Sequence, residues 1–448
     1  MTDKSLSRRG VLKSTAAAGA IAAVGSSTNL FGFADAWAAD NPFKPEIGAK
    51  LQLTRWKRFV QSEDDAFREI VASFTKATGV EISVAEEGLD DIQPKAAVAA
   101  NTGQGADLFW GIFSFPHLFP TQALDLTDAA DYLGNKYGGW SEAAVVYGRG
   151  SGKKWVCMPV AVVGNEINFR RSSIEKAGFK EVPKDTDGFL EMMKALKAQG
   201  TPGGFALGHA SGDGNSWTHW LLWSHGGKLV DENDKVAIDS PETRAALEYC
   251  KKLYDASAPG TISWNDSFNN KAFLSGQIHV TNNGISIYAA AQRNAANGDA
   301  QAKEVADDMD HSYYPIGPVG KPTEFQAVFP IMGMNYTKYP NAVKAFLTYW
   351  MEADQYNKWL QGSVGYVTHT LKAYSDNPVW KEDPKRAVFR DCAERTLPFG
   401  WPGTIGEKAA AAMADFIVVD MFANFASGRV SADDAIKQAA RQTQRIYR

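Results

Sequence analysis

Residues 154–170, KWVCMPVAVVGNEINFR, set the organisation expected for the whole chain. The first five residues are expected to form a short strand. Pro159 then fits an edge or a strand end, because it has no N–H to donate to a ladder. An apolar run to Val163 is followed by Gly164 and by a second extended piece through Phe169. The stretch therefore predicts two short extended segments separated by a glycine.

The sequence before this stretch alternates between strand and helix patterns. A strand is expected to end at Trp56, and Phe67, Ile70, Val71 and Phe74 then recur at helical spacing. A strand near 80–84, a helix near 93–101 and a strand at 107–110 follow. This order predicts a parallel sheet with right-handed crossovers, whose ligands bind beyond the carboxyl ends of the strands. Those ends are residues 56–58, 86–87 and 110–113.

Several motifs occur in a fixed order along the chain. The first group is Trp155, Pro159, the small residues 161–164, Asn168 and the EKAG of 175–178. The second is AFLSGQ at 272–277 with TNNG at 281–284. Together they resemble the extracellular solute-binding proteins of ABC importers, the family that includes maltose-binding protein. The resemblance covers the whole chain after residue 38.

This resemblance implies an α/β fold of two lobes, each a mainly parallel sheet flanked by helices. Two or three hinge crossings would join the lobes. Residues 39–161 and 329–364 are expected to form lobe 1, and residues 162–328 and 365–448 to form lobe 2. The ligand would lie between the lobes, and closure of the lobes, not catalysis, would be the work of the protein.

The length and composition of the chain agree with a two-lobe binding protein. A chain of 448 residues suggests two domains. Its net charge of −4 gives no basic footprint for nucleic acid. Three cysteines form no disulfide framework, and Cys250 falls on an apolar helix face, where a buried thiol is expected. Three of the seven histidines, His209, His219 and His225, lie near one another in the sequence but match no metal-binding spacing, so neither a metal nor a cofactor is expected.

The first 38 residues are expected to be a signal peptide. Residues 7–13, SRRGVLK, resemble the twin-arginine export motif, with Val11 where that motif favours Phe. An apolar run at 16–24 and small residues at Ala36 and Ala38 follow. No cysteine lies near the cleavage position, so a free periplasmic monomer without a lipid anchor is expected. Farther along, the apolar residues 409–425 are expected to form a packed core helix, because two aspartates interrupt them.

Aromatic and polar side chains are the candidates for a ligand site. Flat rings can stack on sugar faces, and polar groups must take the hydroxyls, because a buried hydroxyl without a partner costs about 1–3 kcal/mol. The candidate rings are Trp56, Trp110, Phe113, Trp217, Phe399 and Trp401. The candidate polar positions are Glu87, Asn165, Asn283 and the neighbouring Gly284. For each ring, packing in the core stays open as the alternative.

Other ligand classes also stay open. Arg58, at a strand end beside Lys57, could bind an anion or could pair with Glu63 or Glu87. A polyamine would need several carboxylates, for which Glu86, Glu87 and Asp107 are candidates. A secreted carbohydrate-active enzyme would use Glu87 and Asp107. The function expected first is the periplasmic binding component of an ABC importer, which captures a carbohydrate and delivers it to an inner-membrane permease.

Overall fold

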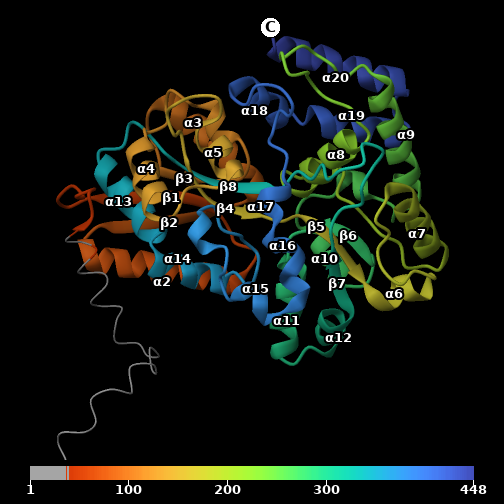
Figure 1. The fold of residues 1–448 in the computed structure, drawn as a ribbon, viewed down its shortest axis with the longest axis horizontal. Coiled ribbons are helices and arrows are strands. Elements are labelled where there is room, and N and C mark those ends of the chain that lie inside the picture. Colours follow the sequence, from red (N-terminus) through yellow and green to blue (C-terminus); the bar gives the residue numbers. More distant parts are fainter. Residues whose placement is uncertain (1–36, 38–39) are drawn as a thin grey trace, which may run out of the picture. The chain divides into compact units, whose positions relative to one another are not determined.

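The computed structural model describes Trp37 and residues 40–448, and within them residues 42–448 form one compact unit. The expected signal peptide, with its twin-arginine motif and its cleavage position, lies outside the described residues except for Trp37. In the compact unit the strands form two sheets, one of five strands and one of three (Figure 1).

The five-stranded sheet has the order β2-β1-β3-β8-β4. Its strands are β1 (Lys50–Trp56), β2 (Glu81–Glu87), β3 (Leu108–Trp110), β4 (Met158–Val163) and β8 (Ala327–Gly333). β1 pairs in parallel with β2 and β3, which confirms the predicted β-α-β-α-β unit. β8 joins antiparallel to both β3 and β4. The register places Trp56 opposite Glu87, so both end the sheet on the same edge.

The three-stranded sheet has the order β6-β5-β7. Its strands are β5 (Glu166–Arg170), β6 (Val280–Asn283) and β7 (Met309–Ser312). β5 pairs antiparallel with both neighbours, so this sheet is not the mainly parallel sheet that the resemblance implied. All four residues of β6 are buried, and they lead directly to Gly284.

The stretch 154–170 passes from one sheet to the other. The predicted strand at 154–158 is displaced: β4 is the apolar run that begins at Met158, and all six of its residues are buried. β4 is an edge strand, and its register shifts after Pro159, as the missing N–H requires. Only Gly164 and Asn165 separate β4 from β5. A Cβ on Gly164 would lie 2.8 Å from the Phe389 ring, so glycine allows the two segments to pack closely.

Most of the remaining chain is helical. The longer helices before β6 are α2 (Gln61–Thr78), α3 (Ile92–Thr102), α4 (Thr127–Lys136), α5 (Glu142–Arg149), α6 (Arg171–Lys176), α7 (Thr186–Ala198), α8 (Asp213–Ser224), α9 (Pro241–Asp255) and α10 (Phe268–Leu274). Those after it are α11 (Ser286–Ala296), α12 (Ala300–Asp308), α13 (Pro340–Trp350), α14 (Ala353–Gly362), α18 (Glu407–Ala414), α19 (Ile417–Ala426) and α20 (Ala432–Ile446). The short helices are α15 (Val379–Glu382), α16 (Ala387–Arg390) and α17 (Cys392–Arg395).

Local sequence signals account for several helix ends. Ser240 accepts the Thr243 N–H at the start of α9, and Ser431 accepts the Asp434 N–H at the start of α20. Gly79 takes a left-handed conformation after α2, as a C-terminal glycine does. α2 begins at Gln61 without a side-chain cap. The buried residues 205–207 form an irregular segment before α8.

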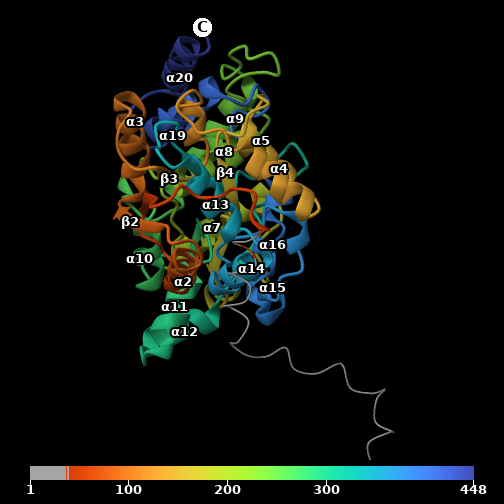
Figure 2. The same cartoon turned by 90° about the vertical axis from the view of Figure 1, so that its left-hand side faces the viewer.

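The apolar C-terminal segment forms two helices instead of the one expected. α18 ends at Ala414 and α19 begins at Ile417, and Phe416 between them has φ 52°. Residues 407–426 are the one described segment long and apolar enough to match a membrane span, and 56% of the matching window is buried within the protein. α19 packs on α8, α9 and α20 (Figures 1 and 2). The segment therefore contributes to the core beside α8.

Candidate functional site

A cleft lies between the edge of the five-stranded sheet and residues from the three-stranded sheet and α8. It contains two neighbouring chambers that share Leu89 and Ile112 in their walls. The inner chamber spans about 470 Å³ including the solvent at its mouth, and the outer chamber about 1010 Å³. The inner chamber is lined by Trp56, Asn165, Asp213, Asp266, Phe329 and Tyr366, among others. The outer chamber is lined by Gln93, Phe113, His209, Asn215, Met413 and Phe416, among others.

Asn165 is the centre of a hydrogen-bond network in the inner chamber. Its Nδ2 donates to Asp213 Oδ1 at 2.5 Å, and its Oδ1 accepts from Asn282 Nδ2 and from the Tyr314 hydroxyl, both at 2.8 Å. Asn269 Nδ2 donates to the other carboxylate oxygen of Asp213 at 2.7 Å. The short link between β4 and β5 therefore fixes the first carboxylate of helix α8.

Asp266 is the second carboxylate in the inner chamber. Its Oδ1 accepts from the backbone N–H groups of Asp213 at 2.7 Å and of Gly212 at 3.1 Å. Burial, together with the charge of the neighbouring Asp266, raises the pKa of Asp213 well above its ordinary value. Burial also raises the pKa of Asp266 to about 6. The two acids therefore compete for ionisation in one confined space.

The link between β4 and β5 is also tied to Gln326, the residue just before β8. Asn165 donates its backbone N–H to Gln326 Oε1 at 2.5 Å, and Gln326 Nε2 donates to Glu166 Oε1 at 2.9 Å and to Glu324 Oε2 at 3.2 Å. Arg395 forms an ion pair with Glu324. Burial, and then the Glu324 charge, raise the pKa of Glu166 well above its ordinary value. A movement of Gln326 or of the link between β4 and β5 would therefore change the hydrogen bonds of Asn165.

Two residues of the outer chamber have strained backbones. Phe113 has φ 55° and Phe416 has φ 52°, in the left-handed region that bulky residues rarely adopt. Such residues cost on the order of 1–3 kcal/mol each and cluster at functional sites. Phe113 stacks on Phe325 with ring centroids 4.8 Å apart, and Phe416 stacks on His209 at 4.4 Å. The strain therefore fixes two rings at the wall of the cleft.

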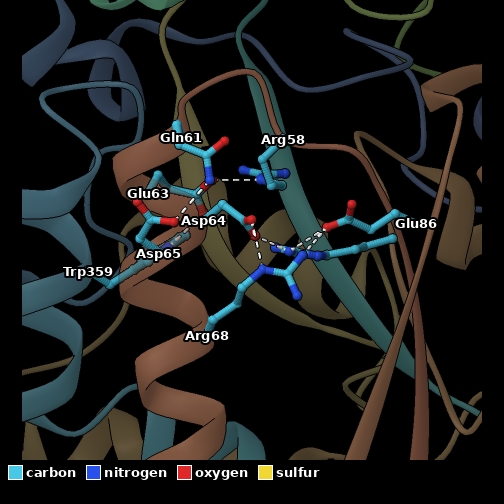
Figure 3. A network of polar contacts seen from close by, with 9 residues as sticks. Arg58, Gln61, Glu63, Asp64, Asp65, Arg68, Glu86 and Trp359 are labelled. Atoms are coloured by element: carbon cyan, nitrogen blue, oxygen red, sulfur yellow. Dashed lines mark hydrogen bonds and ion pairs between the residues drawn. The ribbon is translucent and has the colours of Figure 1, made fainter. Parts of the chain in front are cut away.

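Arg58 is enclosed and does not line either chamber. Its Nε donates to Glu63 Oε2 at 2.7 Å, and Glu63 also accepts from Trp359 Nε1 (Figure 3). The guanidinium lies over the Trp56 ring, 4.0 Å from its centroid, and its side chain is 1% exposed. The alternative of an ion pair with Glu63 is thus the arrangement observed, and the guanidinium is walled off from a ligand in the cleft by aromatic rings.

The carboxylates named for the polyamine and enzyme alternatives lie elsewhere. Glu86 accepts from Arg55 and Arg68 (Figure 3), and Glu87 pairs with Lys95 at 3.0 Å. Both lie at the end of β2. Asp107 precedes β3 and its side chain accepts the Gln52 N–H, whereas Glu87 is the β2 residue paired with Trp56. Gln52 and Trp56 are four residues apart along β1, which is about 13 Å, so Glu87 and Asp107 do not face each other across one bond.

The structure separates the predicted site residues into two groups. Five lie in the cleft walls: Trp56, Asn165, Asn283 and Gly284 in the inner chamber and Phe113 in the outer chamber. The others do not line the chambers: Arg58, Glu87, Trp110, Trp217 and Trp401. Trp217 is 2% exposed in α8, and its Nε1 donates to the Ala206 carbonyl. Trp401 packs edge-on against Trp223, and Phe399 is buried against Tyr147.

Asp213, Asp266, Phe329 and Tyr366 were not predicted from the sequence. Asp213 carried one usable signal, since it is an acid at the first position of a helix and stands between Gly212 and Gly214. Asp266 lies in an irregular segment and has no local pattern. Among the described residues, no group of three or more His, Cys, Asp or Glu side chains could hold a metal ion. The cysteines at 157, 250 and 392 are all buried.

Comparison with known proteins identifies a family and several relatives of this chain. The model of a family described as bacterial extracellular solute-binding protein matches residues 69–388. A probable ABC transporter-binding protein of Deinococcus radiodurans is 22% identical over 250 residues, which are 54% of this chain and 57% of that protein. The diacetylchitobiose binding protein DasA of Streptomyces coelicolor is 27% identical over 208 residues, 45% of this chain and 47% of that protein. The chain thus spans about half the length of these relatives.

Solved structures show the same fold. A maltose-bound MalE3 of T. maritima superposes with a TM-score of 0.75 at 19% identity, covering 89% of this chain and 100% of that one. A sugar transporter protein of Arthrobacter chlorophenolicus with bound laminaribiose gives 0.74 at 17% identity, covering 89% and 99%. A solute-binding protein of Agrobacterium radiobacter in complex with ribitol gives 0.73 at 16%, covering 90% and 100%. At these identities the likeness shows the two-lobe α/β fold of periplasmic binding proteins.

Proposed function

The chain belongs to the family of bacterial extracellular solute-binding proteins, and from that premise we propose that it is the periplasmic binding component of an ABC importer for a carbohydrate. The observation that carries the proposal is the inner chamber. There the rings of Trp56, Phe329 and Tyr366 lie with the polar side chains of Asn165 and Asp213. Sugars and polyols need both apolar faces and hydrogen-bonding groups in one site.

In this proposal the cleft closes on its ligand and opens to release it. Residues 39–161 and 329–364 form one lobe, and residues 162–328 and 365–448 form the other. The sheets support a division near these positions, because β4 and β5 belong to different sheets and so do β7 and β8. The chain is exported by the twin-arginine route as a monomer without a lipid anchor. The closed, liganded form docks on an inner-membrane permease.

Two alternatives lose support from the geometry. Arg58 does not line either chamber, so an anion has no arginine to bind. Glu87 and Asp107 do not face each other, so the enzyme alternative lacks its pair of acids. A turnover assay separates a binding protein from an enzyme. We expect sugars incubated with equimolar protein to be recovered unchanged.

Thermal unfolding with a panel of sugars, polyols and sugar acids tests the proposal. A ligand at a thousand times its dissociation constant should stabilise the folded chain by about 4 kcal/mol. We expect a clear shift with one carbohydrate class, and loss of that shift in Asn283→Ala. No shift with any member, in folded protein freed of bound ligand by unfolding and refolding, would contradict the carbohydrate assignment.

A further inference from the structure

The charges along the cleft are of one sign. Asp213 and Asp266 line the inner chamber, and Asp90 lines the outer chamber. Of the described residues that line the two chambers, none is a lysine or an arginine. The cation beside the inner chamber, Arg58, is paired with Glu63 and lies behind the Trp56 ring. The acids of the cleft therefore have no ion-pair partner among the residues of its walls.

The carboxylate oxygens still have acceptor capacity. A carboxylate can accept about four hydrogen bonds. Asp213 accepts one from the Asn165 amide and one from the Asn269 amide. Asp266 accepts from two backbone N–H groups on one side of its carboxylate, one of which also reaches its second oxygen. Each acid can thus take at least one more donor from a molecule in the chamber.

Asn215 independently indicates that the cleft needs a hydrogen-bond donor from a ligand. Its side chain is 2% exposed and lines the outer chamber, yet its Oδ1 has no hydrogen-bond partner among the described residues. Its Nδ2 donates to the Ser211 carbonyl. An acceptor buried to this degree is costly to leave unpaired. Trp56 offers the complementary group, since its indole N–H is buried without a partner at the inner chamber.

Resting on the proposed function, we propose that the ligand is a carbohydrate or polyol bearing a protonated amine, whose ammonium is received by Asp213 and Asp266. An ammonium supplies three donors and the positive charge that this space lacks. The rings of Trp56, Phe329 and Tyr366 already lie against the Arg58 guanidinium, at 4.0, 4.7 and 5.7 Å from their centroids, so the attraction for the ammonium comes from the two carboxylates. A hydroxyl of the same ligand takes the Trp56 indole N–H. A sugar acid is repelled by both carboxylates.

The proposal is tested with matched sugars that differ in one substituent. Isothermal titration at pH 7 compares glucosamine, glucose, N-acetylglucosamine and glucuronate, together with chitobiose, cellobiose and diacetylchitobiose. We expect the amines to bind at least tenfold more tightly than their hydroxyl and acetamide counterparts, and glucuronate not to bind.

Two variants locate the effect. Asp266→Asn and Asp213→Asn should each remove the preference for the amine and keep any binding of the neutral sugar. Asp107→Asn is the matched control, since it removes one negative charge outside the chambers and should keep the preference. Equal or tighter binding of the neutral sugar by the unmodified protein would by itself overturn the inference and keep the carbohydrate function. That comparison needs no variant, so it stands even if a variant fails to fold. Absence of binding by every sugar would instead overturn the proposed function.

Discussion

Asn165 shows at the scale of a residue how the fold and the site depend on each other. It makes side-chain hydrogen bonds to Asp213, Asn282 and Tyr314, and its backbone N–H bonds to Gln326. Asn165→Ala would leave several of these buried groups unpaired. We expect the free energy of unfolding to fall by about 1–3 kcal/mol and the stabilisation by ligand to be lost. Urea unfolding with and without ligand measures both effects.

The control for this prediction is Asn335→Ala. Asn335 also donates its Nδ2 to a carbonyl, that of Thr121, but it does so at the surface and outside the cleft. It should change stability by less than about 1 kcal/mol and keep the full ligand effect. If Asn165→Ala retained the ligand effect, the amide would have only a structural role.

Asp266 predicts a pH dependence of stability. Burial raises its pKa from 3.8 to about 6, so between those values the folded chain holds a proton that the unfolded chain releases. The contribution of this group to the free energy of unfolding is therefore largest below pH 4 and falls as the pH rises toward 6. In Asp266→Asn this fall should be absent. Urea unfolding of both proteins from pH 4 to 7 measures it, and parallel curves would contradict the prediction.

The residues of the site could be predicted only where a strand or a named motif ended. Trp56 ends β1, so strand order was enough to predict it at the sheet edge, whereas Asn283 and Gly284 were named from the TNNG motif of the resemblance. Asp266 comes from an irregular segment that tertiary contacts bring to α8, and no local period marks it. Trp110 follows the same strand-end pattern as Trp56 but is 0% exposed, because rings from α2, α13 and α14 cover it.

At the scale of elements, the aromatic side chains divide between core and cleft. Trp110 lies 4.9 Å from Trp350 and 5.2 Å from Phe67, measured between ring centroids. Trp110→Leu should lower the free energy of unfolding by about 2–4 kcal/mol, with the affinity of the folded protein changed by less than about threefold. Thermal unfolding and calorimetric titration measure the two quantities.

The matched change in the cleft is Phe59→Ala. Phe59 lies in the segment between β1 and α2, is only partly buried and lines the inner chamber. It should weaken ligand binding by about tenfold or more and cost less stability than Trp110→Leu. If Trp110→Leu weakened binding as strongly as Phe59→Ala, the core assignment of Trp110 would be wrong.

Helices with a clear hydrophobic period could be predicted from the sequence. Elements whose ends are determined by tertiary packing could not. The helical spacing of Phe67, Ile70 and Phe74 matches α2, whose buried face contains all three. β4 was displaced in the prediction, because a strand buried on both faces has no alternation to mark its ends. The break at Phe416 also has no glycine or proline beside it to announce it. Packing of α19 against α8 and α9 determines where that helix starts.

At the scale of the whole molecule, a hydrogen bond between Asp90 and Ser211 spans the outer chamber. Asp90 lies in the turn after β2, and Ser211 lies just before α8. The Ser211 hydroxyl donates to Asp90 Oδ1 at 2.6 Å across the outer chamber. Because Asp90 follows β2 and Ser211 precedes α8, we expect the proposed opening of the cleft to break this contact. It is exposed, so by itself it should contribute about 1 kcal/mol or less to closure.

Ser211→Asp should therefore oppose closure. It places a second carboxylate beside Asp90, and two like charges about 4 Å apart repel by roughly 1–4 kcal/mol near a protein surface. We expect weaker binding of a neutral sugar by about tenfold and a larger radius of gyration with ligand by small-angle X-ray scattering.

Ser211→Ala removes only the hydrogen bond and should weaken binding by less than about fivefold. Adding Asp90→Asn to Ser211→Asp removes the repulsion and should restore both affinity and compaction. If the double variant bound no better than Ser211→Asp, the loss would come from local damage at α8, and the Asp90–Ser211 contact would have no part in closure.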